Sequence, residues 1–501
     1  MQLFSKKPIF GSTKPKLNFM SIWKRKSITQ LLTEADESEK GLKRTLSSKA
    51  LVALGIGAII GAGLFSLTGI AAAENAGPAV TLSFVLAAVG CAFAGLCYAE
   101  FASMIPVAGS AYTYSYATMG EFMAWIIGWD LVLEYALGAA TVGVSWSRYF
   151  LELLNKFGIH LPPNLICSPW ETLKLSDGTV IEGGMINLPA VIIVSLLSLL
   201  LIRGTKESAS LNNFLVILKV SVVILFIVLG WGFINEANYS PYIPENTGVK
   251  GQFGWSGIAA GAATVFFAFI GFDAVSTAAQ EAKNPQKGMP IGILGSLVVC
   301  TILYVLFAHV MTGLVPYHQF AGDAKPAATA FAVTGYDFLQ NGLIIAILAG
   351  YTSVMLVMLM GQSRVFYTMS RDGLLPPFFG EIHPKFRTPW KTNLFFLVFV
   401  SLFAGFVPVS DLGHMVSIGT LLAFVLVCIG ILVMRKKMPD VPRAFKTPLV
   451  PFVPIAGVVV CLYLMYSLPL ESWLRLVVWM ALGVVFYFIY GKKNSKINKE
   501  Q

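Results

Sequence analysis

Twelve long apolar segments constrain the fold of this chain more than any other feature of its sequence. A membrane-spanning helix needs about 20 apolar residues, and hydrophobic residues make up 56% of the 501 residues against 12% charged residues. The segments are 51–73, 79–100, 120–150, 186–202, 209–234, 257–280, 289–315, 339–370, 391–408, 414–434, 449–468 and 472–490. Their apolar runs are continuous rather than alternating, which excludes barrel strands. We expect an all-α polytopic membrane protein with about 12 transmembrane helices, the third and eighth extending beyond the bilayer.

The basic residues are distributed very unequally between the two faces of such a protein. If the segments alternate in direction, 29 of the 36 Lys and Arg residues lie on the face that carries both termini, and 6 lie on the opposite face. The first 50 residues carry 11 of them and have no apolar signal-peptide core. This bias predicts a multi-pass protein of the cell membrane with both termini in the cytoplasm. The basic patches are expected to contact anionic membrane lipid rather than nucleic acid.

Two of the segments contain features that interrupt a helix. The first holds Gly61-Ala62-Gly63 near its middle, and the sixth holds Gly271 among phenylalanines. Glycine costs about 1 kcal/mol relative to alanine in a helix interior. Close helix packing through small residues is one explanation. Local unwinding is the other, and we favour it because both interruptions fall at the same place in two sets of five segments.

Paired interruptions of this kind are typical of transporters built from inverted repeats, with a binding site near the membrane midplane. We therefore expect two repeats of five helices each, with discontinuous helices 1 and 6 and two appended helices. The predicted layout is a polar cytoplasmic head (1–50), a first repeat (51–234), a second repeat (257–434), helices 11 and 12 (449–490) and a cytoplasmic tail (491–501).

The chemistry of broken helices indicates the class of ligand. The N-terminal end of a half-helix offers free N–H groups that suit a carboxylate. The C-terminal end of the other half offers carbonyl groups that suit an ammonium group. A site with both therefore favours an α-amino acid.

Four stretches make the chain resemble a known family. They are GIGAIIGAGLF (55–65), YAEFASMIPVAGSAYTYSYATMGEFMAWIIGWDLVLEY (98–135), FFAFIGFDAVSTAAQEAKNPQKGMPIGI (266–293) and SRVFYTMSRDGLLP (363–376). They resemble the amino acid–polyamine–organocation superfamily, and within it the cationic amino acid transporter subfamily and its bacterial relatives. The resemblance spans roughly residues 42–490. It implies secondary transport of amino acids across the cell membrane by alternating access. One departure is Gln280, where the subfamily often has Glu.

The resemblance also implies roles for individual residues. The substrate carboxylate would be bound at Ile60, Gly61, Ala62 and Gly63. The α-amino group would be bound by the carbonyl groups of Phe267, Ala268, Phe269, Ile270 and Gly271. Phe267 would also act as a gate over the site.

Charged residues inside the segments are the candidates for coupling. Lys219 lies well inside the fifth segment, where a lysine costs about 2.5–3.5 kcal/mol on insertion scales. Proton-coupled bacterial members of the family carry a lysine here, beside the first segment, which makes Lys219 the candidate proton-coupling residue. Asp130 and Glu134 share one face of the third segment. Glu134 either contacts a cationic substrate side chain or supports the scaffold, and Asp273 either contacts substrate or gate or has a local hydrogen-bonding role.

A second group of charges lies at the predicted cytoplasmic ends of the segments. It consists of Glu100, Glu281, Lys283, Arg364, Arg371 and Asp372. We consider two alternatives for it, a gate of ion pairs and simple anchoring at the membrane interface.

Two methionines bear on specificity. Met355 and Met358 share a face of the eighth segment, and in this family that part of the helix lines the side-chain pocket. Methionines narrow the pocket, so we expect proton-coupled symport of small neutral L-amino acids such as alanine. The alternative is a transporter or exchanger of cationic amino acids or polyamines. An enzyme is not expected because no catalytic cluster is visible, and neither a cofactor nor a metal site is expected.

Overall fold

The structure is a computed structural model that describes residues 22–28, 30–31, 46–107, 109–174, 180–203, 209–277, 279, 282–323 and 325–499. Most of the predicted head lies outside these residues. The helices are α2 (Ser48–Ile59), α3 (Thr68–Ala71), α4 (Val80–Met104), α5 (Ser110–Thr118), α6 (Glu121–Lys156), α7 (Leu188–Arg203), α8 (Ala209–Trp231), α9 (Gly254–Val265), α10 (Ala274–Thr277), α11 (Pro285–Leu314), α12 (Pro326–Ala332), α13 (Asp337–Arg371), α14 (Trp390–Phe406), α15 (Val409–Lys437), α16 (Phe452–Ser467), α17 (Leu470–Phe486), α18 (Lys492–Asn494) and α19 (Lys496–Lys499). The sheet in the described chain is β1 (Thr172–Lys174) paired antiparallel with β2 (Val180–Glu182).

The helices account for every predicted apolar segment. In the described chain, 8 stretches are long and apolar enough to cross a membrane, and the shorter apolar helices α2, α7, α14 and α16 accompany them. The all-α polytopic membrane fold is therefore confirmed. Helices α6 and α13 have 36 and 35 residues. At about 1.5 Å per residue, both are longer than the roughly 30 Å hydrocarbon core of a bilayer.

Local sequence explains where several helices begin. The side chain of Ser47 accepts a hydrogen bond from the N–H of Ala50 and caps α2. Asn284 caps α11, and Pro285 follows it at the first helical position. A proline at this position is favourable because its missing N–H would have no partner in the helix. Caps of this kind depend only on residues next to one another in the sequence.

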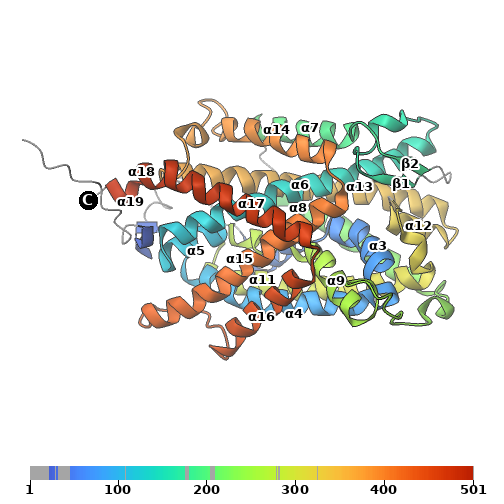
Figure 1. Cartoon of the computed structure of the whole chain (residues 1–501), viewed down its shortest axis with the longest axis horizontal. Helices are drawn as coiled ribbons and strands as arrows, with labels where there is room; N and C mark the ends of the chain where they lie inside the picture. The colour runs from blue at the N-terminus through green and yellow to red at the C-terminus, as the bar shows by residue number, and fades with distance from the viewer. Residues whose placement is uncertain are drawn as a thin grey trace, which may run out of the picture.

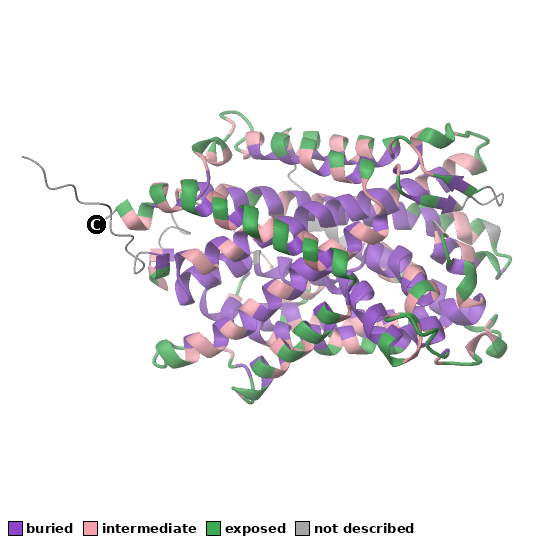
Figure 2. Ribbon diagram, in the orientation of Figure 1, coloured by how far each residue is buried: buried purple, intermediate pink, exposed green. Residues whose placement is uncertain are grey.

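The broken helices lie in the centre of the bundle. Helices α6 and α13 run side by side along its long axis, and α4 and α11 form a second contacting pair (Figure 1). Of the 18 most apolar consecutive residues in Gly254–Ser276, 94% are buried inside the protein. In Leu470–Asn494 the corresponding share is 22%. Exposed positions accordingly recur along α14 and α17 at the rim (Figure 2).

The two ends of the bundle differ in what they carry. One end holds residues 22–28, α5, α18 and α19, and we call it the termini end. The other end holds α12 and the β1–β2 pair, and we call it the hairpin end (Figure 1).

Candidate functional site

Helix 1, which runs from α2 to α3, is interrupted at the glycine pair. Helix α2 ends at Ile59, and Ile60 has extended backbone angles (φ −70°, ψ 108°). A π-helical turn over Gly63–Leu67 then leads into α3. The N–H groups of Gly61 and Ala62 donate no backbone hydrogen bond within the described chain, whereas the Gly61 carbonyl accepts from Leu64 and Phe65. The predicted unwinding of helix 1 is therefore present.

Helix 6, which runs from α9 to α10, is interrupted in a different way. A 3₁₀ turn over Phe266–Phe269 follows α9, and Ile270 is extended (φ −61°, ψ 138°). Gly271 has φ 112°, and a Cβ at this position would lie 2.8 Å from the Ala58 carbonyl oxygen. Side chains are strongly disfavoured at such a φ. Glycine is therefore required here both by the backbone conformation and by the close approach of helix 1.

The two breaks are in direct contact. A Cβ on Gly63 would lie 2.2 Å from the Ala268 Cα atom, so no side chain fits between the two segments. Phe267, Ala268, Phe269 and Ile270 are all buried. The breaks therefore place the N–H groups of helix 1 near the backbone of helix 6, which is the arrangement expected for the two ends of an amino acid.

The methionines of α13 lie against α6. Met358 Sδ lies 2.9 Å from where a Cβ on Gly138 would be, and Met355 Sδ lies 3.6 Å from the corresponding position on Gly143. Both sulfur atoms thus face α6. The α13 residue against Gly61 is Val354, whose Cγ2 lies 3.3 Å from a Cβ built there. Sequence reasoning missed Val354, although it lies one turn before Met358 on the same helix face.

Lys219 lies beside the break in helix 1, as the resemblance implied. Its side chain is 2% exposed, and its Nζ donates to the Gly57 carbonyl at 2.7 Å and to Ser353 Oγ at 3.4 Å. In a continuous helix the Gly57 carbonyl would accept from the N–H of Gly61. That bond is missing at the break. Lys219 therefore supplies a donor to a carbonyl group that the unwinding leaves free.

Three acids are buried in this part of the protein, two on α6 and one directly before α10. Asp273 Oδ2 accepts hydrogen bonds from Tyr135 Oη at 2.5 Å and from Ser110 Oγ at 3.4 Å. No donor within the described chain hydrogen-bonds the carboxyl oxygens of Asp130 and Glu134. The Glu134 carboxyl group lies against that of Asp273, and two carboxyl groups can hydrogen-bond to each other only when one of them carries a proton. Burying an unpaired carboxylate is costly. A buried carboxyl group needs a proton or a nearby cation to offset this cost. Glu134 and Asp273 are therefore candidate groups for binding a proton or another cation, in addition to their structural role.

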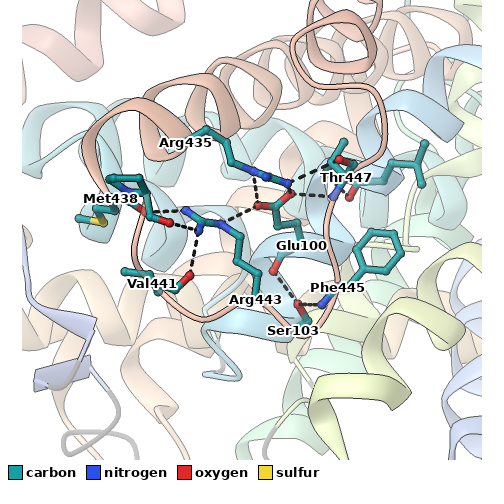
Figure 3. A network of polar contacts seen from close by, with 10 residues as sticks. Glu100, Ser103, Arg435, Met438, Val441, Arg443, Phe445 and Thr447 are labelled. Atoms are coloured by element: carbon teal, nitrogen blue, oxygen red, sulfur yellow. Dashed lines mark hydrogen bonds and ion pairs between the residues drawn. The ribbon is translucent and has the colours of Figure 1, made fainter.

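The described charges considered as a gate or as interface anchors do not pair with one another at Glu100. Glu100 is completely buried and accepts hydrogen bonds from Arg435 Nε and Nη2 and from the Thr447 N–H, all at 2.8 Å (Figure 3). It also forms an ion pair with Arg443, whose Nε lies 3.1 Å from Glu100 Oε1. These partners belong to α15 and the loop after it. Glu100 is thus held by arginines outside the expected group.

Asp372 also has a partner that the sequence did not indicate. Its Oδ1 pairs with Lys26 Nζ at 2.6 Å, and its Oδ2 accepts from Tyr112 Oη at 2.6 Å. Arg371 lies over the Tyr367 ring, with its Cζ atom 5.9 Å from the ring centroid. Gln280 and Glu281 lie outside the described residues. Among the described residues, no cluster of three His, Cys, Asp or Glu residues is arranged to hold a metal ion.

Comparison with known proteins identifies the family of this chain. A family model described as amino acid permease matches residues 46–493. A branched-chain amino acid permease of Bacillus subtilis is 47% identical over 479 residues, which cover 96% of this chain and 99% of the relative. A methylthioribose transporter of the same organism is 43% identical and is covered over its whole length, with 96% of this chain aligned. A vacuolar cationic amino acid transporter of Arabidopsis thaliana is 36% identical over 84% of this chain and 68% of its own length. The chain therefore belongs to the amino acid permease family, and it is a multi-pass membrane transporter rather than an enzyme.

Proposed function

We propose that this permease carries neutral L-amino acids across the cell membrane in symport with protons, by alternating access. The observation that carries the proposal is the direct contact between the two helix breaks. The N–H groups of Gly61 and Ala62 lack backbone acceptors, and the carbonyl groups of the 3₁₀ turn in helix 6 lie across from them. An amino acid needs both kinds of group at a short separation.

Each substrate group is assigned to one part of this site. Ile60, Gly61, Ala62 and Gly63 would receive the carboxylate. The stretch Phe267–Gly271 would receive the ammonium group, with Phe267 as the gate. Val354 would meet the substrate side chain, and Met355 and Met358 would limit the space behind it, because their sulfur atoms fill the gap in front of the α6 glycines.

The side chain of the substrate is proposed to be neutral. Alanine-like amino acids were the expectation from the methionines alone. Relatives named branched-chain amino acid permeases, at 47% and 35% identity, support an extension to valine, leucine and isoleucine. The apolar side chain of Val354 at Gly61 fits such a substrate and offers no charge to a cationic one.

Lys219 is proposed as the residue that couples transport to protons. Its ammonium group holds the Gly57 carbonyl, so loss of its proton would remove a charged donor from the start of the break. Glu134 and Asp273 are the alternative proton carriers. Their burial without a basic partner in the described chain supports that alternative.

The orientation follows from the charge bias. We propose that the termini end faces the cytoplasm, where the 29 basic residues contact anionic lipid. The two repeats (51–234 and 257–434), the appended helices (449–490), the head (1–50) and the tail (491–501) then have the layout predicted above.

Uptake into proteoliposomes tests the function. Labelled alanine, leucine and arginine would be offered with and without an inward proton gradient. Accumulation of alanine and leucine that requires the gradient, with arginine well below both, is the expected result. Gradient-independent uptake would contradict proton coupling.

The same assay decides the second candidate, transport of cationic amino acids or polyamines. That candidate is favoured by the two buried acids Glu134 and Asp273 and by relatives named cationic amino acid transporters. Arginine uptake that exceeds alanine and leucine uptake would establish it. Unlabelled methylthioribose is included as a competitor, because one relative carries that name.

A further inference from the structure

Tyr304 of α11 lies between the two helix breaks and contacts both. Its Oη atom is 3.0 Å from the Ile59 carbonyl oxygen and 2.9 Å from the Ala268 carbonyl oxygen. The residue is completely buried. Tyr304 is therefore a side chain of a third helix that joins helix 1 to helix 6 at the point where each is interrupted.

Both carbonyl groups have lost their helical donors. In a continuous helix the Ile59 carbonyl would accept from the N–H of Gly63, and the Ala268 carbonyl would accept from that of Phe272. Helix α2 instead ends at Ile59, and Phe272 does not donate to Ala268. A tyrosine hydroxyl carries one hydrogen, so the two carbonyl groups share it in a three-centre bond. If either break moves away from Tyr304, the distance from the hydroxyl group to that carbonyl group increases and that half of the bond weakens.

The position of Tyr304 is fixed by its surroundings. Its ring packs against Phe84 and Phe269, with centroid distances of 5.5 and 5.3 Å. Helix α11 also lies very close to α2, since a Cβ on Gly55 would be 2.5 Å from Ser296 Oγ. The hydroxyl group therefore acts as a fixed point on the scaffold, to which both breaks are tied.

We propose that Tyr304 is a positioning residue for substrate binding, which holds the two breaks at the separation that one α-amino acid backbone requires. The carboxylate and ammonium groups of an amino acid are attached to the same carbon atom, so their receptors must keep a constant distance. This inference rests on the proposed function. It predicts that Tyr304 affects every amino acid substrate equally, because the part of the molecule that it serves is common to all of them.

The test compares binding of L-alanine and L-leucine to the purified full-length protein and its variants. Tyr304→Phe keeps the ring and removes only the hydroxyl group. We expect the Kd to rise about threefold to tenfold, the range given by the loss of one hydrogen bond, and by the same factor for both ligands. Tyr239→Phe is the matched control. Its hydroxyl donates to the His309 carbonyl of the same helix α11 at 2.8 Å, away from both breaks, so Kd is expected to stay within about twofold.

The outcomes separate this inference from the function on which it rests. If the unmodified protein binds neither amino acid, the proposed function is wrong. If it binds both and Tyr304→Phe binds them equally well, only the role of Tyr304 is wrong. A change in the ratio of the two Kd values would also overturn the inference, because Tyr304 would then act on the side chain.

A second variant decides the matter if Tyr304→Phe does not elute as a single species. Gly55→Ala leaves Tyr304 and the assigned substrate contacts intact and pushes α11, which carries Tyr304, away from α2, because its Cβ would lie 2.5 Å from Ser296 Oγ. The same equal loss of affinity for both amino acids is expected. Unchanged affinity in Gly55→Ala would contradict the proposal.

Discussion

Lys219 and Tyr304 perform related tasks at the residue scale. Lys219 donates to the Gly57 carbonyl, and Tyr304 donates to the Ile59 and Ala268 carbonyls. All three acceptors lie where a helix has been unwound. A buried carbonyl group without a donor costs free energy. By donating to these carbonyl groups, the two side chains lower the free-energy cost of the unwound segments inside the protein. Lys219 differs in that its donor group can lose a proton.

The first prediction concerns Lys219→Ala. We expect this variant to lose proton-driven accumulation of substrate, because the group that changes charge is gone. Amino acid binding measured by thermal shift should change less, since Lys219 holds Gly57 and Ser353 rather than the predicted substrate contacts. Lys250→Ala is the control, because Lys250 lies on an exposed loop with its Nζ 3.7 Å above the Tyr466 ring. Full accumulation by Lys219→Ala would transfer the coupling role to Glu134 or Asp273.

The breaks themselves are features of the element scale, and they depend on glycine in two different ways. Gly63 is needed because the backbone of Ala268 occupies the space of a side chain. Gly271 is needed in addition because its φ of 112° is unfavourable for other residues. The sequence indicated both glycines but not this difference, because the space around a residue depends on the neighbouring helix.

Gly271→Ala tests the break in helix 6. Its Cβ would lie 2.8 Å from the Ala58 carbonyl oxygen at an unfavourable φ, which costs about 1–3 kcal/mol in strain. We expect a lower melting temperature and a loss of amino acid binding together. Gly342→Ala on α13 is the control, because no atom lies within 4 Å of its added Cβ. Normal binding by Gly271→Ala would show that the break does not need the left-handed conformation.

Glu100 ties several elements together at the termini end. It joins α4 to Arg435 at the end of α15 and to Arg443 and Thr447 in the following loop (Figure 3). Arg443 in turn donates to the carbonyl groups of Met438, Pro439 and Val441. The network therefore fixes α4 and α15 relative to each other as one unit.

Glu100→Gln should destabilise the protein strongly. Removing one partner of a buried ion pair costs about 3–5 kcal/mol, and here two arginines lose their carboxylate. Glu381→Gln is the matched control, since Glu381 pairs with Lys391 where their side chains are 47% and 26% exposed. A surface pair of this kind contributes at most about 1 kcal/mol. Equal melting temperatures for the two variants would mean that the Glu100 network does not stabilise the fold.

At the scale of the whole molecule, both terminal segments help to close the termini end. The Lys24 carbonyl accepts from the N–H of Glu121, and Lys26 pairs with Asp372. From the other terminus, Asn498 donates to Glu121, and the N–H of Lys496 donates to the Asp372 carbonyl. Glu121 is the first residue of α6, and Asp372 directly follows α13. These are the two longest helices of the described bundle. Opening this end therefore requires that both segments be released.

Lys26→Met is expected to make the termini end open more readily. Labelling of a cysteine introduced at buried Ser115 of α5 by a charged thiol reagent reports on this opening. The six native cysteines are all buried, so their background reaction is small. Loss of about 1 kcal/mol of closing energy gives about fivefold faster labelling. Lys391→Met, which breaks an exposed pair, should leave the rate unchanged, and an unchanged rate in Lys26→Met would argue against a closing role.

The sequence by itself determined the membrane class, the positions of all twelve apolar segments, the two helix breaks and the family resemblance. These features depend on local composition, namely segment length and the conformational preferences of glycine. A helix boundary is set by residues within one helical turn of it, so it can be predicted from the neighbouring residues in the sequence. The position of Lys219 inside the fifth segment was predicted from the sequence itself, whereas its place beside helix 1 was predicted from the resemblance.

Only the tertiary structure decided which side chains meet at the breaks and which charges pair. Tyr304 lies 245 residues from Ile59, Lys219 lies 162 from Gly57, and Arg435 lies 335 from Glu100. The sequence placed Glu100 and Asp372 in one group of charges, as a gate or as interface anchors, whereas the two acids have separate partners on α15 and in the N-terminal segment. The sequence alone does not show which basic side chain pairs with which acidic one, because pairing depends on their positions in space. Helix packing selects one partner from many by bringing a few atoms within hydrogen-bond distance.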